Sequence, residues 1–275
     1  MILPRFLIIG AMKAGTTSLY DMLRAVPGLY LPPEKEPGDL LHEAVETPSG
    51  RARYARKFAA APTGSLCGEA TTAYAKRPEH EGIASRARRV LGPDLRVIYM
   101  VRDPVARALS HHRHLVGLGQ EKRPAEIALR TDPSYADFGR YSWQIDPWQT
   151  EFGQDQVLIL SLERLAADPQ GALDRACSFL GVAGAAARAT HGNASVGRRA
   201  TRVGTPAHAL MRAPLYQYRL KPLLPAPLHR LGKRVFLRPG PKPLSHISAE
   251  TETKFRRALC DDPLSRAAGE WARGA

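Results

Sequence analysis

The feature that most constrains this chain is a stretch near its start, residues 6–18, where an apolar run leads through a glycine turn into a helix. The run Phe6–Ile9 is continuously apolar, which is typical of a strand buried on both faces. Gly10 and Gly15 follow it, and glycine permits a tight turn and a close approach to a ligand. The segment 18–24 then has apolar residues at helical spacing. This order aims several backbone N–H groups and a helix N-terminus at one point, which predicts a phosphate-binding site.

The loop differs from a Walker A sequence in the position of its lysine. GxxxxGK[ST] has a lysine directly after the second glycine, where this chain has Thr16. The loop lysine is Lys13, and the hydroxyls are those of Thr16 and Thr17. The shifted lysine indicates a bridging group other than the β- and γ-phosphates of ATP. The alternative is a plain strand–helix turn with an exposed lysine.

A second candidate anion site follows the segment Leu95–Val101, whose β-branched content predicts a strand. Arg102 comes directly after it, and Asp103 and Pro104 have the chemistry of a helix N-cap and first helical position. Ser110 lies about two turns along the predicted helix, on the same face as its start. A guanidinium, a helix N-terminus and a hydroxyl would then meet. The alternative is that Arg102 only pairs with a neighbouring carboxylate.

Strand-like and helix-like segments alternate along most of the chain. The predicted strands are 6–9, 64–69, 95–101 and 156–161, and the predicted helices are 18–24, 51–60, 82–91, 104–115, 163–181 and two short ones within 248–271. Aromatic segments 141–145 and 148–152 are predicted to form a helical hairpin that packs in the core. The pattern predicts an α/β fold, a P-loop-like three-layer domain with a central parallel sheet flanked by helices. We expect one domain over residues 1–275, with both anion motifs at the carboxyl edge of the sheet.

Composition sets the expected compartment. The N-terminal apolar run is too short for a signal peptide, and no apolar segment is long enough to span a membrane. The three cysteines, Cys67, Cys177 and Cys260, are far apart and match no zinc spacing. They are therefore expected to be free thiols in a reducing, cytoplasmic environment.

The positive charge is concentrated in one part of the chain. The net charge is +14, and residues 175–249 carry 13 Lys and Arg but no Asp or Glu. Such a segment attracts anions: a nucleotide, an acidic acceptor, nucleic acid or a membrane surface. Its proline-containing part, about 184–243, is predicted to form part of the acceptor side or a lid. Broken helices over 207–237 are a further candidate for peripheral membrane contact.

Together the motifs resemble the sulfotransferases that use 3′-phosphoadenosine-5′-phosphosulfate (PAPS), in particular bacterial relatives of the heparan sulfate N- and 3-O-sulfotransferases. The resemblance rests on four segments in the family's order: the 5′-phosphosulfate loop at 6–17, a KEP element at 35–37, a GE-x-SP-x-Y-like segment at 68–74, and the 3′-phosphate motif at 97–110. It covers nearly the whole chain and is weakest from about Gly184 to Pro243.

The resemblance implies the site residues. Lys13, Glu36 and Lys35 would be catalytic: Lys13 stabilises the leaving 5′-phosphate, Glu36 is the base that deprotonates the acceptor, and Lys35 tunes Glu36 or contacts the donor. The implied donor-binding residues are Lys13, Ala14, Gly15, Thr16, Thr17 and Ser18 for the 5′-phosphosulfate, and Arg102 and Ser110 for the 3′-phosphate, with Arg198 and Arg199 as further candidates. PAPS is the implied cosubstrate and 3′-phosphoadenosine-5′-phosphate (PAP) its product. No metal is expected.

The acceptor is less constrained. The heparan-type members follow the glutamate with an aromatic pair, whereas this chain has Pro37-Gly38-Asp39-Leu40-Leu41. The acceptor is therefore expected to be a glycan or a small molecule with a hydroxyl or amine, with the oligomeric state open. His42 is an alternative base, and His111 and His112 are expected on a helix flank without a chemical role.

Two other functions fit parts of the sequence. An ATP-dependent phosphotransferase would share the loop but would require a lysine after its second glycine. A non-catalytic nucleic-acid-binding module would use the basic segment, but its aromatics, Tyr216, Tyr218 and Phe236, are few and interrupted by prolines. No nucleic-acid partner is therefore expected.

Overall fold

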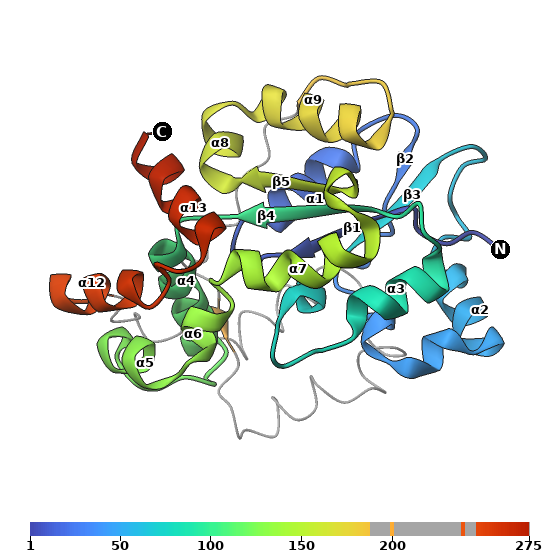
Figure 1. Cartoon of the computed structure of the whole chain (residues 1–275). Helices are drawn as coiled ribbons and strands as arrows, with labels where there is room; N and C mark the ends of the chain where they lie inside the picture. The colour runs from blue at the N-terminus through green and yellow to red at the C-terminus, as the bar shows by residue number, and fades with distance from the viewer. Residues whose placement is uncertain (188–198, 201–237, 240–245, 275) are drawn as a thin grey trace.

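Five parallel strands form the sheet at the centre of the computed structural model (Figure 1), which describes residues 1–187, 199–200, 238–239 and 246–274. Their order is β2-β3-β1-β4-β5. The strands are β1 (Phe6–Gly10), β2 (Leu29–Tyr30), β3 (Leu66–Ala70), β4 (Arg96–Val101) and β5 (Val157–Ser161). All five residues of β1 are buried, as expected for the continuous apolar run of a strand covered on both faces.

Helices cover both faces of this sheet and its carboxyl edge. In Figure 1, α1, α8 and α9 lie on one face, α3 and α7 lie on the other, and α4, α6, α12 and α13 gather beyond the arrowheads of the strands. The helices are α1 (Thr16–Leu23), α2 (Pro48–Arg56), α3 (Ile83–Leu91), α4 (Pro104–Gly117), α5 (Ala125–Thr131), α6 (Ser134–Asp137), α7 (Tyr141–Phe152), α8 (Leu162–Ala167), α9 (Pro169–Leu180), α12 (Ala249–Arg257) and α13 (Pro263–Gly274). Short 3-10 helices are η1 (Asp39–Leu41), η2 (Glu43–Glu46), η3 (Thr72–Ala75) and η4 (Gln154–Gln156). The predicted three-layer α/β fold is confirmed.

The strand order reverses direction at β1. The chain runs from β1 to β2 and β3 on one side, then crosses to β4 and β5 on the other. In parallel sheets, ligands bind where the order reverses, beyond the carboxyl ends of the strands. The loops after β1, β3 and β4 therefore lie around this switch point.

The predicted helical hairpin at residues 141–152 is wrong, because these residues form one helix, α7, with Pro147 inside it. A proline within a helix removes one N–H, which leaves the carbonyl four residues earlier without its usual donor. Here that carbonyl belongs to Trp143, and it accepts a hydrogen bond of 2.9 Å from Nη1 of Arg77. A partner from outside the helix therefore satisfies the group that Pro147 leaves open. The aromatics Tyr141, Trp148 and Phe152 are buried, as predicted.

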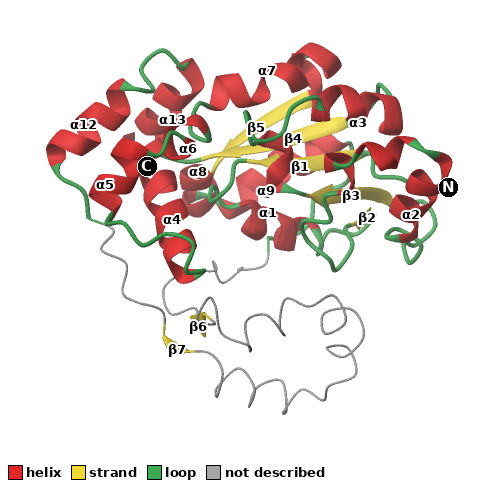
Figure 2. Ribbon diagram, turned by 90° about the horizontal axis from the view of Figure 1, so that it is seen from below, coloured by secondary structure: helices red, strands yellow, loops and turns green. Residues whose placement is uncertain are grey.

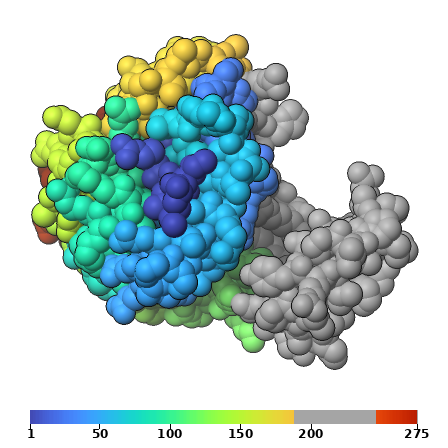
Figure 3. All heavy atoms as spheres, turned by 90° about the vertical axis from the view of Figure 1, so that its right-hand side faces the viewer, coloured from blue at the N-terminus to red at the C-terminus, as the bar shows by residue number. Residues whose placement is uncertain are grey.

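The start of the chain lies at the amino ends of the strands, opposite the carboxyl edge. Figure 3 shows the N-terminal segment, dark blue, on the surface of this face. Met1 and Ile2 are exposed there, and Cys67 of β3 lies beneath them in a shallow cavity of about 330 Å³. Cys67, Cys177 and Cys260 are free thiols, as predicted. Among the described residues, none of the helices combines the length and apolarity needed to cross a membrane.

Most of the basic segment lies outside the described residues. The parts that are described include β6 (Arg199–Ala200) and β7 (Arg238–Pro239), which pair antiparallel apart from the main sheet (Figure 2). The predictions for 184–243 and for broken helices over 207–237 fall almost entirely on residues that are not described.

Candidate functional site

The turn after β1 forms the first part of the site. Gly15 is the N-cap of α1 and adopts a left-handed φ of 90°, and a Cβ at this position would lie 2.6 Å from Cδ1 of Leu162. Glycine is therefore required by both backbone conformation and space. Gly15 has no side chain to cap the helix. The positive end of α1, with the first-turn amides of Thr16, Thr17 and Ser18, is therefore not capped by its N-cap residue. With Ala14, these predicted donor-binding residues form one continuous turn.

Lys13 is half-buried in this turn and adopts a left-handed backbone, with φ 70°. Its carbonyl accepts a hydrogen bond of 3.3 Å from Nη1 of Arg102, which comes from the end of β4. Its ammonium lies close enough to α4 to help lower the pKa of His111. The two predicted anion motifs are therefore adjacent at one edge of the sheet.

A second loop carries Glu36 onto the end of β3. The Glu36 N–H donates to the carbonyl of Ala70 at 2.9 Å, and the Gly38 N–H donates to Oγ1 of Thr71 at 3.4 Å. Further along, the Leu40 N–H donates to the hydroxyl of Tyr74 at 3.2 Å. Three backbone donors thus attach this loop to the segment that follows β3, which fixes where Glu36 stands.

The Glu36 carboxylate is held but still reachable from solvent. Its oxygens accept from the Thr72 N–H at 2.7 Å and from the Thr72 hydroxyl at 3.2 and 3.3 Å, and its side chain is 40% exposed. Nζ of Lys35 lies 3.0 Å from Oε1 of Glu36 and 3.3 Å from Oγ1 of Thr16. Lys35 therefore links the carboxylate to the first turn of α1, and the three predicted catalytic residues share one region.

The backbone of Glu36 is left-handed as well, with φ 62°. Among the residues that the structure describes, Lys13 and Glu36 are the two non-glycine residues with positive φ. This conformation costs free energy for a residue with a Cβ and persists only where the surroundings enforce it. Strained residues of this kind concentrate at functional sites. Two such residues lie on different loops, one after β1 and one bonded to the end of β3.

Arg102 directly precedes the N-cap of α4, and Ser110 lies about two turns into the helix. The predicted N-cap is confirmed, because Oδ1 of Asp103 accepts from the Ala106 N–H at 2.8 Å. Oδ2 of Asp103 pairs with Nη1 of Arg256 at 2.8 Å, so this carboxylate does not neutralise Arg102. Ser110 is nearly buried one turn beyond Ala106.

Arg113 adds a cation that the sequence analysis did not identify. It lies one turn after Ser110 on α4, and its buried Nε has no hydrogen-bond partner among the described residues. Helical side chains lean toward the N-terminus, so Arg113 reaches back toward Ser110. Burial lowers the pKa of Arg113, and the charge of Arg102 lowers it further. Two guanidiniums therefore share a region without a carboxylate between them. The i, i+3 spacing from Ser110 was the available sequence signal.

The histidines do not compete with Glu36 in this arrangement. His42 is exposed and precedes η2, and its ring has no hydrogen bond or ion pair in the described part of the chain. His111 and His112 lie on α4, and both are buried. Burial, with the nearby charges of Arg107, Lys76, His114 and Lys13, lowers the pKa of His111 to about 3. His111 is thus neutral in an electropositive region.

Two of the predicted donor-binding residues, Arg198 and Arg199, belong to the basic segment. Arg198 lies outside the described residues, and Arg199 falls in β6, where its side chain is not described. Thr72, which binds the Glu36 carboxylate, was not predicted to act at the site. Its position in the segment 68–74 was the available signal, since that segment follows the strand next to β1.

The chain is similar to known proteins over about two thirds of its length or more. A family model described as "Sulfotransferase domain" matches residues 3–191. Mouse heparan sulfate glucosamine 3-O-sulfotransferase 3B1 is 30% identical over 191 residues, covering 66% of this chain and 46% of the relative. Human heparan sulfate glucosamine 3-O-sulfotransferase 6 is 30% identical over 192 residues, covering 65% of this chain and 52% of the relative. The chain spans about half the length of these curated relatives.

Solved structures give the same result for the fold. A sulfotransferase from Alicyclobacillus acidocaldarius has 29% sequence identity and a TM-score of 0.61, covering 70% of this chain and 86% of that chain. A mouse sulfotransferase complexed with PAP has a TM-score of 0.55 over 99% of this chain and 89% of that chain. Its 15% identity supports the fold alone.

Proposed function

Because the chain belongs to the sulfotransferase domain family, we propose that it transfers a sulfuryl group from PAPS to a hydroxyl or amine of an acceptor, leaving PAP. The observation that carries this proposal is how Lys13 and Glu36 are held on two loops that a hydrogen-bonded link joins. Each is held in a left-handed backbone, and Lys35 bridges from Glu36 to Thr16 of the phosphate-binding turn. This link supports a site in which the Lys13 ammonium and the Glu36 carboxylate would act on the same sulfuryl group.

The donor would be held at two places. The turn Lys13–Ser18 offers backbone amides, the Thr16 and Thr17 hydroxyls and one ammonium to the 5′-phosphosulfate. Arg102 and Ser110 would bind the 3′-phosphate, with Arg113 as an additional cation at the same place. The contact between Arg102 and the Lys13 carbonyl keeps the two places at a fixed separation.

The chemistry needs a proton acceptor and a stabiliser of the leaving group. The acceptor oxygen or nitrogen forms a bond to sulfur as the bond from sulfur to the 5′-phosphate oxygen breaks, and Glu36 takes the acceptor proton. Negative charge develops on the phosphate oxygen, where Lys13 stabilises it. Thr72 orients the carboxylate through its N–H and hydroxyl, and Lys35 forms an ion pair with it at 3.0 Å.

The acceptor is proposed only as a class. The curated relatives are named for heparan sulfate glucosamine, a glycan, and this chain would take a glycan or a small molecule that carries a hydroxyl or amine. After Glu36 this chain has Pro37-Gly38-Asp39, where small and acidic residues replace an aromatic pair, so its acceptor wall differs from that of the heparan-type enzymes. A panel of sugars, phenols and alcohols tested with labelled PAPS would identify the acceptor.

Calorimetry tests the donor. We expect PAP to bind without added magnesium and more tightly than ATP with magnesium. Preferential binding of ATP with magnesium would reject the sulfotransferase proposal in favour of a phosphotransferase.

A further inference from the structure

The proposed mechanism leaves one buried acid without a role. Glu69 is the penultimate residue of β3 and is 1% exposed. Neither of its carboxyl oxygens has a hydrogen-bond partner of good geometry among the described residues. Burying a carboxylate without pairing carries a large desolvation cost, which a protein relieves by keeping the group protonated.

The groups around Glu69 come from three elements. Tyr54 of α2 and Tyr74 of η3 face its carboxyl group closely enough to lower its pKa, and Asp39 of η1 faces it and raises the pKa. Lys57, just after α2, pairs with Oδ2 of Asp39 at 3.0 Å and lowers the Glu69 pKa. Burial is the largest effect, and it raises the pKa of Glu69 to about 7. Two buried carboxyl groups thus share one ammonium.

This cluster lies directly under the loop that carries Glu36. The hydroxyl of Tyr74 accepts the Leu40 N–H at 3.2 Å, and Nη1 of Arg86, from α3, donates to the Leu40 carbonyl at 2.9 Å. Asp39, in the same 3-10 helix, is held by Lys57. At the other end of the loop, the Glu36 N–H binds the carbonyl of Ala70, the residue after Glu69. One end of the loop therefore rests on Tyr74, which faces the Glu69 carboxyl group, and the other end on the backbone of the residue after Glu69.

We propose that Glu69 is a positioning residue that keeps the Glu36 loop docked on β3, and that it does so as the neutral acid. The neutral carboxyl group can exchange hydrogen bonds with the hydroxyls of Tyr54 and Tyr74 and leaves the single charge of Lys57 to Asp39. Ionised Glu69 would add a second negative charge beside Asp39, and the loop would open to relieve the repulsion. This inference rests on the proposed function, because it assigns the loop its importance through Glu36.

Hydrogen exchange measured by mass spectrometry tests the proposal without an acceptor. In the wild-type chain, we expect protection of peptides covering residues 34–42, corrected for intrinsic exchange, to fall about tenfold between pH 6 and pH 8. In Glu69→Gln the protection should be independent of pH, because the amide does not ionise. Peptides from β4 serve as the internal reference. If protection in Glu69→Gln fell with rising pH as it does in the wild type, the proposal would be overturned.

Two further variants separate positioning from a general loss of folding. Glu34→Gln removes an exposed carboxylate that also contacts Lys57, at 3.4 Å, so it should keep the wild-type pH profile. Tyr74→Phe removes the acceptor of the Leu40 N–H, so the loop should exchange faster at every pH. Equal exchange in Tyr74→Phe and the wild type would contradict the proposal even if Glu69→Gln failed to fold.

The outcome is distinguishable from failure of the proposed function. Calorimetric binding of PAP reports the donor site, whereas exchange in the loop reports docking. Absence of PAP binding with a pH-dependent loop would reject the sulfotransferase proposal alone. Binding of PAP with a loop whose protection does not depend on pH would reject the role of Glu69 alone.

Discussion

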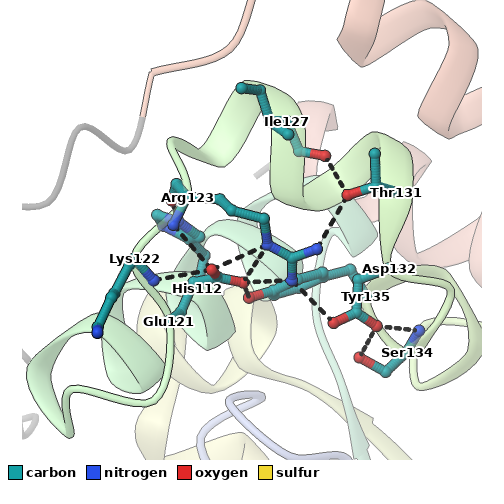
Figure 4. Close-up of polar contacts among 9 residues, drawn as sticks. All are labelled: His112, Glu121, Lys122, Arg123, Ile127, Thr131, Asp132, Ser134 and Tyr135. Carbon is teal, nitrogen blue, oxygen red and sulfur yellow. Dashed lines mark hydrogen bonds and ion pairs between the residues drawn. The ribbon is translucent and has the colours of Figure 1, made fainter.

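Two buried glutamates show how differently one side chain can be used in this fold. Glu121, between α4 and α5, is 7% exposed and accepts hydrogen bonds from Nε and Nη2 of Arg123, the Lys122 and Arg123 N–H groups and the hydroxyl of Tyr135 (Figure 4). The bond from Arg123 is the largest of the effects that lower the Glu121 pKa to about 2. Glu69 is buried at least as deeply, yet burial raises its pKa to about 7.

The difference lies in the partners, since both side chains are removed from water. In the Glu121 network both carboxylate oxygens have donors, and Arg123 also pairs with Asp132 at 3.3 Å. The His112 ring closes the network at the Arg123 carbonyl, 2.9 Å away. Such a network fixes the loop between two helices and satisfies the buried carboxylate of Glu121. The loops around Glu69 and Glu36 instead contain strained backbone and under-paired charge, which are characteristic of functional sites.

The largest expected effect separates the two regions by activity. Lys13→Ala should lower the rate of transfer by roughly 10²–10³-fold, because it removes the charge that stabilises the leaving phosphate. Glu36→Gln should lower it by roughly 10²–10⁴-fold, because the amide cannot accept the acceptor proton. Transfer of labelled sulfate from PAPS measures both rates, and calorimetry with PAP should show weakened binding for Lys13→Ala only.

The control for these variants is their stability. Alanine at position 13 and glutamine at position 36 carry a Cβ, as the native residues do, so the backbone strain at both positions should be unchanged. Urea denaturation should therefore show unfolding free energies close to the wild type. A full rate of transfer in Glu36→Gln would remove Glu36 as the base and return His42 as the alternative.

The second effect is on stability and belongs to the other region. Glu121→Ala leaves two backbone N–H groups and the Tyr135 hydroxyl without their acceptor, and it should lower the free energy of unfolding by about 3 kcal/mol. The Glu121 pKa lies below its usual value, so its stabilisation is present above about pH 4.5 and is lost as pH falls toward 2. Urea denaturation at pH 7 and pH 3 measures both changes. A variant as stable as the wild type would show that the network adds nothing to the fold.

The two regions also differ in how far the sequence predicts them. The site could be predicted from the sequence because its parts follow strands. The glycine turn after β1 and Arg-Asp-Pro after β4 each have a local pattern with a chemical meaning. The KEP element was identified by its resemblance to the sulfotransferases. Their convergence follows from parallel strands having their carboxyl ends at one edge. The Glu121 network has no such pattern, since Asp132 and Tyr135 reach it only through the packing of α5 and α6 on α4.

Tertiary partners explain the remaining differences. The hairpin expected at 141–152 is a single helix because Arg77, more than sixty residues away in sequence, satisfies the carbonyl that Pro147 leaves open. Thr72 reaches the Glu36 carboxylate, and Arg113 lies near Arg102, only through the placement of η3 and α4. The raised pKa of Glu69 likewise depends on Tyr54 and Asp39, which come from separate segments.

The third effect reverses the sign of the pH dependence. The folded-state pKa of Glu69 is above its unfolded value, so the native chain binds more protons than the unfolded chain between about pH 4.5 and pH 7. Stability should therefore fall by roughly 2 kcal/mol as pH rises through this range, the opposite direction from Glu121. Glu69→Gln should abolish this decline. Urea denaturation from pH 5 to pH 8 measures it, and an identical decline in the variant would assign it to another group.

The smallest expected effect concerns two arginines, Arg113 and Arg123, which differ in their partners as the two glutamates do. Arg123 is occupied by Glu121 and Asp132, whereas Arg113 lies near Arg102 without a carboxylate between them. If the unpaired guanidinium is kept for the 3′-phosphate, Arg113→Ala should weaken PAP binding about fivefold, since a half-exposed cation contributes about 1 kcal/mol. Binding of adenosine 5′-phosphate, which lacks the 3′-phosphate, should not change. Arg123→Ala should affect neither ligand while lowering stability. Equal losses for both ligands in Arg113→Ala would mean that Arg113 supports the folding of α4 and not recognition of the second phosphate.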